Sequence, residues 1–559
     1  MNAITGSSAF LTLLEDEGVD ILFGNPGTTE LPIMNALKDH PNIRYIMGLQ
    51  ESIVIAMADG YARSSGKLAA CNVHVAPGLG NGMGAIYNAN WVGSPIIITA
   101  GQQEQGHGLM EPLLYGPLVE MAKPLVKWAI EVTRLEDLPR ILRRAAKIAL
   151  TPPTGPVFIS LPGDILNTTA SINLGYPTRV ITATQPVDAM IDKLVSCILK
   201  SSRPVILCGH EIATSDSLTE AGEFAETIGA PVYQQTTPYG AHFLSEHNCF
   251  MGALTRDQKQ VREILTNHDL LICIGTDVLR MSVYSKVDPL PDGMEIIQLG
   301  LRDWEMGKNY PTRIAVRSDL KVTLPILSNA LQTSMTFQQK KTRDRRIEDI
   351  AKKNWEFKRT TLTTKLQHMA HATPIAPNVL MHHIVNAVPD DVIVVDEALV
   401  SSRALLSLLP FKTANDYFGL ASGGIGFAAA GVIGIHLANP ERPIIAIVGD
   451  GSAMYSIQAL WTVANMRLPI TYIIANNHSY RILKERLIDF HNNSCFIGMD
   501  MNDPPIDFVM LATSMGIKSR KIDRVSDVIP AIKKSIDSNH PNLLEIVVSD
   551  GFQNKAAPK

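Results

Sequence analysis

Residues 444–480 read IIAIVGDGSAMYSIQALWTVANMRLPITYIIANNHSY, and this stretch decides the fold. An apolar run ends in GDGS at 449–452, and a helix-like segment follows. A second apolar run ends in NNHSY at 476–480. Two short apolar runs separated by a helix are typical of parallel strands joined by a right-handed crossover. Both runs therefore end in small, oxygen-bearing residues at the same edge of a predicted sheet.

Asp450 and Asn477 carry oxygen atoms at these two strand ends. Carboxylate, amide and main-chain carbonyl oxygens suit Mg²⁺, which prefers hard ligands and often shares them with phosphate. The small residues after Asp450 allow a ligand close to the backbone, and N–H groups at the next helix start attract phosphate. The stretch predicts a metal–diphosphate site. The alternative is that GDG is a tight turn and NN only a strand end.

The same alternation of apolar runs and helical patterns covers the whole chain. A polar, turn-rich stretch near 167–190 and a charged stretch near 335–360 interrupt it. We therefore predict an α/β protein with three doubly wound parallel-sheet domains at 1–180, 185–335 and 360–559. The strand-like runs, which end in Gly, Pro or polar residues, are DILFGNPG, IRYIMGLQE, AACNVHVAPG, PIIITAGQQ, PVFISLPGD, RPVILCGHE, APVYQQTT, DLLICIGTD, MEIIQLG, DDVIVVDEA, RPIIAIVGDG, PITYIIANN and NLLEIVVSDG.

Composition narrows the class of protein. The 559 residues carry a formal net charge of -4 and no basic block, so no nucleic-acid partner is expected. The six cysteines lack a CxxC pair and are predicted to be reduced core residues. The N-terminal 20 residues predict a capped amphipathic helix instead of a signal peptide, and no apolar run approaches the roughly 20 residues that span a bilayer. We expect a cytoplasmic protein without a membrane partner.

GDG followed by NN resembles the diphosphate–magnesium motif of thiamine diphosphate enzymes. The resemblance implies that Asp450, the side chain of Asn477 and the main-chain carbonyl of Ser479 bind Mg²⁺. It implies that the cofactor is held by Asn477 and by four further residues of this stretch, Gly449, Gly451, Ser452 and Tyr480.

Longer segments resemble benzoylformate decarboxylases, among them FGNPGTTELP, LQESIVIAMADGYA, NVHVAPGLGNGMGA and YFGLASGGIGFAAAGVIGIHLANPERPIIAIVGDGSAMYSIQALW. The resemblance covers nearly the whole chain and is weakest in the middle domain. It implies a pyrimidine-binding, a central and a diphosphate-binding domain in that order. It also implies a homotetramer, a dimer of dimers, whose active sites lie between the first domain of one chain and the last domain of another.

Three residues of the first domain match catalytic positions of that family. Glu51, in LQES, matches the glutamate that activates the cofactor's aminopyrimidine for removal of the thiazolium C2 proton. His74, in NVHVAPG, matches the active-site histidine. Thr28, in NPGTTE, occupies a serine position whose hydroxyl meets the substrate carboxylate. The alternatives are a helix N-cap neighbour for Glu51, a structural histidine for His74 and a turn residue for Thr28.

Four apolar or small residues match further positions of the family. The resemblance implies that the Gly423 carbonyl accepts a hydrogen bond from the pyrimidine amino group, and that the Ile425 side chain holds the cofactor bent. Leu113 and Leu114, in MEPLLYG, fall where the family lines its substrate pocket. The alternatives are packing residues at a helix start and ordinary core leucines.

Two departures from the family pattern bear on the reaction. The family has a second active-site histidine in the middle domain, whereas ungapped matching places Ser282 there, in VLRMSVYSKVD. Another histidine, such as His107, is an alternative proton donor. In DEALVSS, Leu399 and Val400 replace the hydroxyl residues that meet the diphosphate, and Ser401 or Ser402 is a candidate substitute.

The resemblance implies non-oxidative decarboxylation of a benzoylformate-like 2-oxo acid, a small-molecule substrate, through an enamine/carbanion intermediate. The alternative traps the same intermediate with a second carbonyl compound, as a carboligase or 2-hydroxy-ketone/2-hydroxyacyl lyase related to acetolactate synthase. Loss of the second histidine favours that alternative, because proton delivery would be slower. The sequence leaves open whether the central domain binds FAD.

Overall fold

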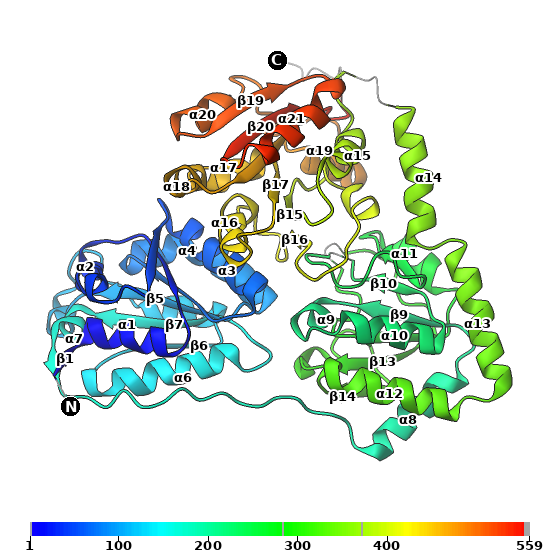
Figure 1. The fold of residues 1–559 in the computed structure, drawn as a ribbon, viewed down its shortest axis with the longest axis horizontal. Coiled ribbons are helices and arrows are strands. Elements are labelled where there is room, and N and C mark those ends of the chain that lie inside the picture. Colours follow the sequence, from blue (N-terminus) through cyan, green and yellow to red (C-terminus); the bar gives the residue numbers. More distant parts are fainter. Residues whose placement is uncertain (1–2, 237, 282–283, 370–372, 553–559) are drawn as a thin grey trace.

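The computed structural model describes residues 3–236, 238–281, 284–369 and 373–552. Three six-stranded sheets, each entirely parallel, confirm the predicted α/β class with three domains. Figure 1 shows the N-terminal domain (blue to cyan) and the central domain (green) side by side, with the C-terminal domain (yellow to red) above them. Among the described residues, no helix combines the length and apolar character needed to cross a membrane.

The N-terminal sheet has the strand order β3-β2-β4-β5-β7-β6. A separate antiparallel pair, β1 and β8, lies at the ends of this domain. The strands are β1 (Ile4–Thr5), β2 (Ile21–Gly24), β3 (Arg44–Met47), β4 (Ala69–Val73), β5 (Ile96–Gln102), β6 (Trp128–Glu131), β7 (Val157–Pro162) and β8 (Thr169–Ala170). The helices are α1 (Gly6–Asp16), α2 (Leu31–Ala36), α3 (Glu51–Ser65), α4 (Val75–Val92), α5 (Leu118–Ala122), α6 (Leu138–Leu150) and α7 (Gly163–Asn167).

The central sheet has the order β11-β10-β9-β12-β13-β14. An extended segment without helix or strand, residues 171–187, leads into it and runs along the lower edge of the molecule in Figure 1. The strands are β9 (Pro204–Cys208), β10 (Val232–Gln234), β11 (Phe250–Ala253), β12 (Leu270–Ile274), β13 (Glu295–Gly300) and β14 (Ile314–Arg317). The helices are α8 (Asp188–Lys200), α9 (His210–Thr214), α10 (Leu218–Ile228), α11 (Gln258–Leu265) and α12 (Leu320–Ser334).

The charged stretch near 335–360 forms two helices, α13 (Phe337–Ala351) and α14 (Trp355–Gln367). These helices connect the central domain to the C-terminal domain (Figure 1). The C-terminal sheet has the order β16-β15-β17-β18-β20-β19. Its strands are β15 (Ile393–Glu397), β16 (Tyr417–Gly419), β17 (Ile444–Gly449), β18 (Ile470–Asn476), β19 (Lys518–Ile522) and β20 (Asn542–Val547). Its helices are α15 (Pro377–Ala387), α16 (Ala428–Ala438), α17 (Asp450–Ser456), α18 (Ala459–Met466), α19 (Arg481–His491), α20 (Phe508–Ser514) and α21 (Val525–Asp537).

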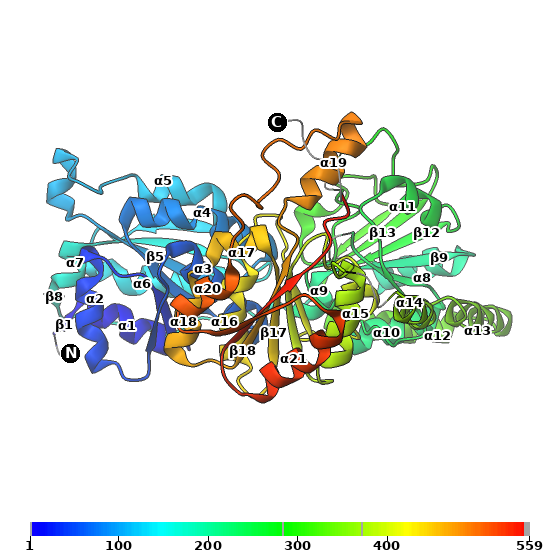
Figure 2. The ribbon, with the colours of Figure 1, turned by 90° about the horizontal axis from the view of Figure 1, so that it is seen from above.

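The N- and C-terminal domains meet where α3 packs on α16, and Figure 2 shows these helices at the contact. Glycines make the contact possible. A Cβ atom on Gly60 would lie 2.1 Å from the carbonyl oxygen of Gly431, and one on Gly434 would lie 1.9 Å from that of Met57. The two backbones therefore touch, and one apolar core runs through both domains.

Arg63, near the end of α3, joins all three domains. Its Nη2 donates to the carbonyl oxygen of Tyr239 in the central domain at 2.7 Å and to that of Gly419 in the C-terminal domain at 3.2 Å. Its guanidinium lies 4.6 Å from the centre of the Phe427 ring. Burial lowers the pKa of Arg63, and the nearby carboxylate of Asp59 opposes that shift. The cation is thus retained by carbonyl oxygens, an aromatic face and a carboxylate.

The expectation of six core cysteines is wrong for one of them. Cys495 is exposed, while the other five are buried. Cys495 lies in the segment between α19 and α20.

Candidate active site

A cavity of about 890 Å³ lies between the carboxyl ends of the C-terminal sheet and the central domain. Open α/β sheets bind ligands at this edge. The loops after β16, β17 and β18 supply much of the wall. The lining includes every residue of the C-terminal domain that was predicted to hold cofactor or metal, namely Gly423, Ile425, Gly449, Asp450, Gly451, Ser452, Asn477, Ser479 and Tyr480.

Parallel pairing of β17 with β18 brings the two halves of the GDG…NN motif together. Gly449 is the register partner of Ala475, so Asp450 and Asn477 follow at adjacent strand ends. Asp450 is buried; its Oδ1 accepts from the Gly451 N–H at 2.9 Å, whereas its Oδ2 has no hydrogen-bond partner among the described residues. Burial raises the pKa of Asp450 to about 6, against the effect of nearby backbone N–H groups. A buried carboxylate oxygen without a donor fits a bound cation.

Asn477 is held at the mouth of the same edge. Its Oδ1 accepts from the Ser479 N–H at 2.9 Å and from the Ser479 hydroxyl at 3.2 Å. Between them, His478 has φ of +56°, a strained value for a non-glycine residue. No cluster of three or more His, Cys, Asp or Glu side chains suited to a metal occurs in the described part of the chain. A metal here would therefore be held by one carboxylate together with amide and carbonyl oxygens, a donor set that fits Mg²⁺.

Two glycines open this edge to a ligand. A Cβ atom on Gly451 would lie 2.7 Å from the Tyr480 ring, so a larger residue would clash beside Asp450. Gly423 has φ of +85°, which glycine adopts without strain. The loop that carries Gly423 is fixed by the buried Glu397, which accepts from the N–H groups of Gly426 at 2.5 Å and Ala428 at 2.6 Å. Sequence reasoning missed Glu397 because its role is to hold a loop some thirty residues away.

The loop after β15 contains Ser401 and Ser402, the two candidates to replace the missing hydroxyl residues in DEALVSS. Leu399, Val400 and Ser401 line the cavity, and Leu399 has φ of +52°. The Ser402 hydroxyl instead donates to the Leu399 carbonyl oxygen at 3.2 Å. Ser401 is therefore the hydroxyl residue that this loop offers to the cavity.

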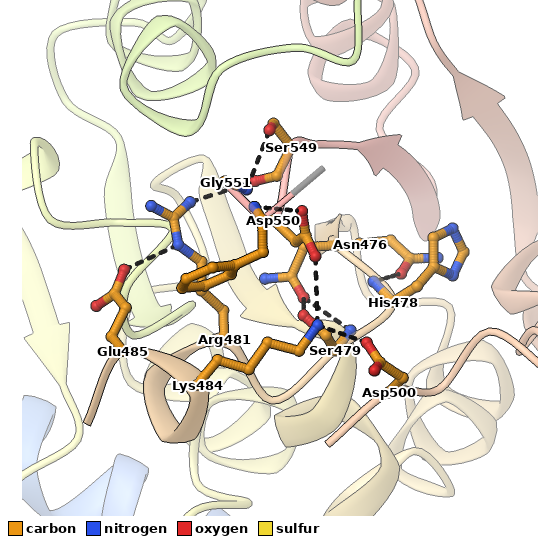
Figure 3. A network of polar contacts seen from close by, with 12 residues as sticks. Asn476, His478, Ser479, Arg481, Lys484, Glu485, Asp500, Ser549, Asp550 and Gly551 are labelled. Carbon is orange, nitrogen blue, oxygen red and sulfur yellow. Dashed lines mark hydrogen bonds and ion pairs between the residues drawn. The ribbon is translucent and has the colours of Figure 1, made fainter. Parts of the chain in front are cut away.

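A polar network beside the loop after β18, residues 477–480, fixes the position of that loop (Figure 3). The buried Lys484 of α19 donates to Asp500 at 2.5 Å and to Asp550 at 3.3 Å. Its Nζ also lies 5.3 Å from the centre of the Phe496 ring and 5.8 Å from that of Phe552. The network therefore ties α19 both to the segment before α20 and to the last described residues of the chain.

The segment that Lys484 holds is itself hydrogen-bonded to the loop after β18. The Tyr480 N–H donates to the Met499 carbonyl oxygen and the Met501 N–H donates to the His478 carbonyl oxygen, each at 2.8 Å. Arg481 adds a bond from its Nη1 to the Ser549 carbonyl oxygen at 3.2 Å. Lys484 is thus a positioning residue, because it holds the backbone on which Ser479 sits.

Glu51, His74 and Thr28 lie in the N-terminal domain, and the described cavity lining contains none of them. Glu51 is the first residue of α3 and is buried; its Oε2 accepts from Asn81 Nδ2 at 3.1 Å. Gly78 leaves room for it, since a Cβ atom there would lie 2.8 Å from the Glu51 Oε1. Within one chain the structure thus forms two separate groups of candidate residues.

His74 is held against the turn that carries Thr28 by a residue that sequence reasoning missed, Glu30. This fully buried carboxylate lies in η1 (Thr28–Glu30). It accepts from the N–H groups of Gly27 and Gly101, each at 2.9 Å, and from the Thr29 hydroxyl at 2.8 Å. It also lies 2.7 Å from His74 Nδ1. The signal in the sequence was the acidic residue directly after the NPGTT turn.

The contact with Glu30 orients the imidazole of His74. A carboxylate accepts, so Nδ1 carries the proton and Nε2 points away from Glu30. Gly27 permits this packing, since a Cβ atom there would lie 2.1 Å from the ring. Val75, the next residue, has φ of +46°, a rare value for a β-branched residue. Strain beside a half-exposed histidine is typical of functional sites.

The candidate substrate-pocket residues lie outside the cavity of this chain or outside the described residues. Leu113 is 86% exposed, so the alternative of a core leucine is wrong for it. Leu114, in the same loop, has φ of +72°. His107 is exposed in η3 (Gln105–Met110). Ser282 lies outside the described residues.

Three stretches of the chain match the models of known protein families. Residues 4–112 match "Thiamine pyrophosphate enzyme, N-terminal TPP binding domain" and residues 401–546 match "Thiamine pyrophosphate enzyme, C-terminal TPP binding domain". Residues 191–327 match "Thiamine pyrophosphate enzyme, central domain".

Complete relatives and solved structures agree with these matches. The chain is 31% identical to a benzoylformate decarboxylase of Pseudomonas aeruginosa, with 97% of this chain and 98% of that protein covered. It is 27% identical to a probable acetolactate synthase large subunit of Methanococcus aeolicus, with 98% and 92% covered. A solved structure of a Rhodococcus jostii thiamine diphosphate-dependent 4-hydroxybenzoylformate decarboxylase superposes with a TM-score of 0.86 at 29% identity, covering 98% of this chain and 99% of that one.

We expect Glu30→Gln to destabilise the protein by about 1–3 kcal/mol, because a buried network loses an acceptor and gains an unpaired donor. The tautomer of His74 should also become mixed. Urea unfolding measures the first effect and ¹⁵N-histidine NMR the second. Glu136→Gln is the matched control, because this exposed glutamate forms an ion pair with Arg134 and with no other described residue. Unchanged stability and an unchanged His74 spectrum would contradict the orienting role.

We expect Lys484→Met to weaken Mg²⁺-dependent binding of thiamine diphosphate, measured by calorimetry, and to lower stability by about 1–3 kcal/mol. Methionine keeps the packing on the two phenylalanines but leaves Asp500 and Asp550 unpaired. Adding Asp500→Asn and Asp550→Asn should restore most of the stability, because the uncompensated charges are then removed. Wild-type affinity and stability in Lys484→Met would refute the positioning role.

Proposed function

Since the chain belongs to the thiamine pyrophosphate enzymes, we propose that it uses thiamine diphosphate and Mg²⁺ to decarboxylate a 2-oxo acid without oxidation. The observation that carries the proposal is the unpartnered, buried Oδ2 of Asp450, at the edge of a cavity lined by the predicted cofactor residues. When bound, thiamine diphosphate supplies the electron sink that accepts the electron pair left by departing CO₂.

The residues of the C-terminal domain hold the cofactor. Asp450, the Asn477 side chain and the Ser479 carbonyl bind Mg²⁺, and the metal neutralises part of the diphosphate charge. Gly451 and Ser452 open α17, whose N–H groups and helix dipole favour phosphate. The remaining contacts come from four residues that line the same cavity, Gly423, Ile425, Gly449 and Tyr480.

The residues of the N-terminal domain perform the proton chemistry. Glu51 would donate a hydrogen bond to a ring nitrogen of the bound pyrimidine and so favour its imino form, the form that can accept the C2 proton. His74 binds or delivers a proton through Nε2, since Glu30 engages its other ring nitrogen. Thr28 is exposed and presents its hydroxyl to the substrate carboxylate. Leu113 and Leu114 line the apolar side of the substrate pocket.

Because these two groups lie apart within one chain, we propose that the active site forms between chains of a homotetramer. Exposed large apolar side chains support this assembly on both domains. They include Leu31, Leu49, Leu109, Met110 and Leu113 on the N-terminal domain and Met454, Tyr455, Leu483 and Ile497 on the C-terminal domain.

Carboligation is the second candidate function. The region after β12 contains no histidine in its sequence, VLRMSVYSKVD, and so lacks a strong acid to protonate the intermediate at once. A slower proton leaves time for an acceptor aldehyde to react. Similarity to an acetolactate synthase supports the same alternative.

The test is turnover by the purified protein of a panel of 2-oxo acids with thiamine diphosphate and Mg²⁺, with and without an acceptor aldehyde. We expect CO₂ release that is lost after EDTA dialysis and regained when both are restored. Aldehyde as the main product identifies a decarboxylase, and 2-hydroxy-ketone identifies a carboligase. Activity that survives complete removal of metal and cofactor, or no CO₂ from any acid, would refute the proposal.

Glu51→Gln should still bind thiamine diphosphate but should exchange the cofactor's C2 proton about 100-fold more slowly, because the amide cannot protonate the ring. The loss should fall on kcat more than on KM. NMR of C2 hydrogen–deuterium exchange measures the step directly. Glu348→Gln, at an exposed position of α13, is the control. Wild-type exchange in Glu51→Gln would remove Glu51 from this role.

A further inference from the structure

Four arginines line the cavity, and three of them have carboxylate partners. Arg280 pairs with Glu305 at 2.8 Å and with Asp277 at 3.2 Å. The other two partnered arginines are Arg302, 3.8 Å from Asp277, and Arg481, 3.0 Å from Glu485. Arg256 differs, because it makes no ion pair with any residue that the structure describes, although it faces the same space.

Arg256 follows β11 in the central domain and reaches toward the C-terminal domain. The cations Arg486 and Arg403 lie close enough to Arg256 to repel its charge. Burial first, and then these two cations, lower the pKa of Arg256, even though part of its side chain remains exposed toward the cavity. Like charges held together in a partly desolvated place are unfavourable unless an anion joins them.

Arg486 belongs to α19, whose first three residues line the cavity. Ile482 and Leu483 line the cavity, and Arg486 lies four and three residues further along the helix, on the same face. Its guanidinium lies 5.5 Å from the centre of the Phe490 ring and makes no ion pair within the described chain. Arg256 and Arg486, which come from two different domains, are therefore near enough to repel each other, and neither makes an ion pair with a described carboxylate.

Positively charged side chains outnumber carboxylates around Arg256 and Arg486. Arg403 and Arg481 both pair with the single carboxylate of Glu485. Within the described residues, the carboxylate of Glu485 is thus the one that forms ion pairs with any of Arg256, Arg403, Arg481 and Arg486. Arginine is suited to carboxylate and phosphate, which it binds through two parallel hydrogen bonds.

The proposed function already assigns the cofactor's diphosphate to residues other than these arginines. Asp450, through a metal, and the start of α17 hold it in the C-terminal domain, whereas Arg256 belongs to the central domain. Under the proposed function, the substrate meets the cofactor where this cavity faces the N-terminal domain of a second chain, and it is the remaining ligand. Its 2-oxo acid end must lie at the cofactor, so its side chain is free to reach the arginines.

We propose that Arg256 and Arg486 form a second anion subsite, and that the substrate is a 2-oxo acid whose side chain ends in an anionic group, a carboxylate or a phosphonate. This inference rests on the proposed function and specifies its substrate. It makes Arg256 and Arg486 specificity-determining residues, and an acid with an uncharged side chain a poorer substrate.

Matched substrates test the inference. 2-Oxoglutarate is compared with 2-oxohexanoate, 4-carboxybenzoylformate with 4-methylbenzoylformate, and 4-phosphono-2-oxobutanoate shows which anion is preferred. We expect kcat/KM to favour the charged member of a pair by about 10- to 100-fold, the range that a charged hydrogen bond supplies. Added salt should narrow the difference.

Substitutions test whether Arg256 and Arg486 cause the preference for charged substrates. Arg256→Gln and Arg486→Gln should each reduce the preference for the charged member roughly tenfold or more, and Arg256→Lys should retain part of it. Arg345→Gln, at an exposed position of α13, removes the same charge away from the cavity and should leave the preference intact. Neither cavity variant should lower the melting temperature, because each relieves like-charge repulsion.

The outcomes separate the two proposals. Turnover of charged and uncharged acids with equal kcat/KM, unaffected by the variants, overturns the subsite and leaves the decarboxylase proposal standing. If no acid is turned over, calorimetric binding of glutarate against pentanoate still decides the subsite. Preferential, Arg256-dependent glutarate binding supports it and equal binding overturns it. If Arg256→Gln weakens thiamine diphosphate binding without changing the substrate preference, the arginines serve the cofactor and the inference is wrong.

Discussion

The arrangement of the three domains depends on one buried cation. Arg63 leaves α3 of the first domain and donates to main-chain carbonyls of the second and third, at Tyr239 and Gly419. Gly419 ends β16, and the loop that follows leads directly to Gly423 in the cavity wall. A guanidinium group suits this junction because it keeps its charge and offers donors in several directions. The cavity exists because the strand ends of two domains are held face to face beside this junction.

The central strands of each sheet were predictable and several edge strands were not. The quoted apolar runs include β4, β5, β9, β12, β15, β17 and β18, because strands covered on both faces read as continuous apolar stretches. The runs omit β6, β11, β14, β16 and β19, which all lie at sheet edges. β19, for example, reads KSRKI, since an edge strand is partly solvated and charged side chains protect it from wrong pairing. Position in the sheet, which sequence alone does not reveal, explains the difference.

The residues of the candidate site also divide into those that the sequence predicts and those that it does not. Residues that act from one contiguous loop, such as those at 449–452 and 476–480, were predicted because their spacing is encoded locally. Glu30, Glu397 and Lys484 were missed because their partners are distant in sequence. Arg256 was missed for a related reason. Its significance lies in a partner it lacks, and only the folded chain shows which charges surround it.

The Glu30 contacts constrain how this loop can diverge among descendants of the protein. One carboxylate satisfies two backbone N–H groups, a hydroxyl and the imidazole of His74. An exchange of His74 for an apolar residue would leave that carboxylate buried with a lost partner, and an exchange of Gly27 would place a side chain inside the ring. Substitutions at positions 27, 30 and 74 are therefore expected to occur together or not at all, because each residue depends on the other two for its contacts.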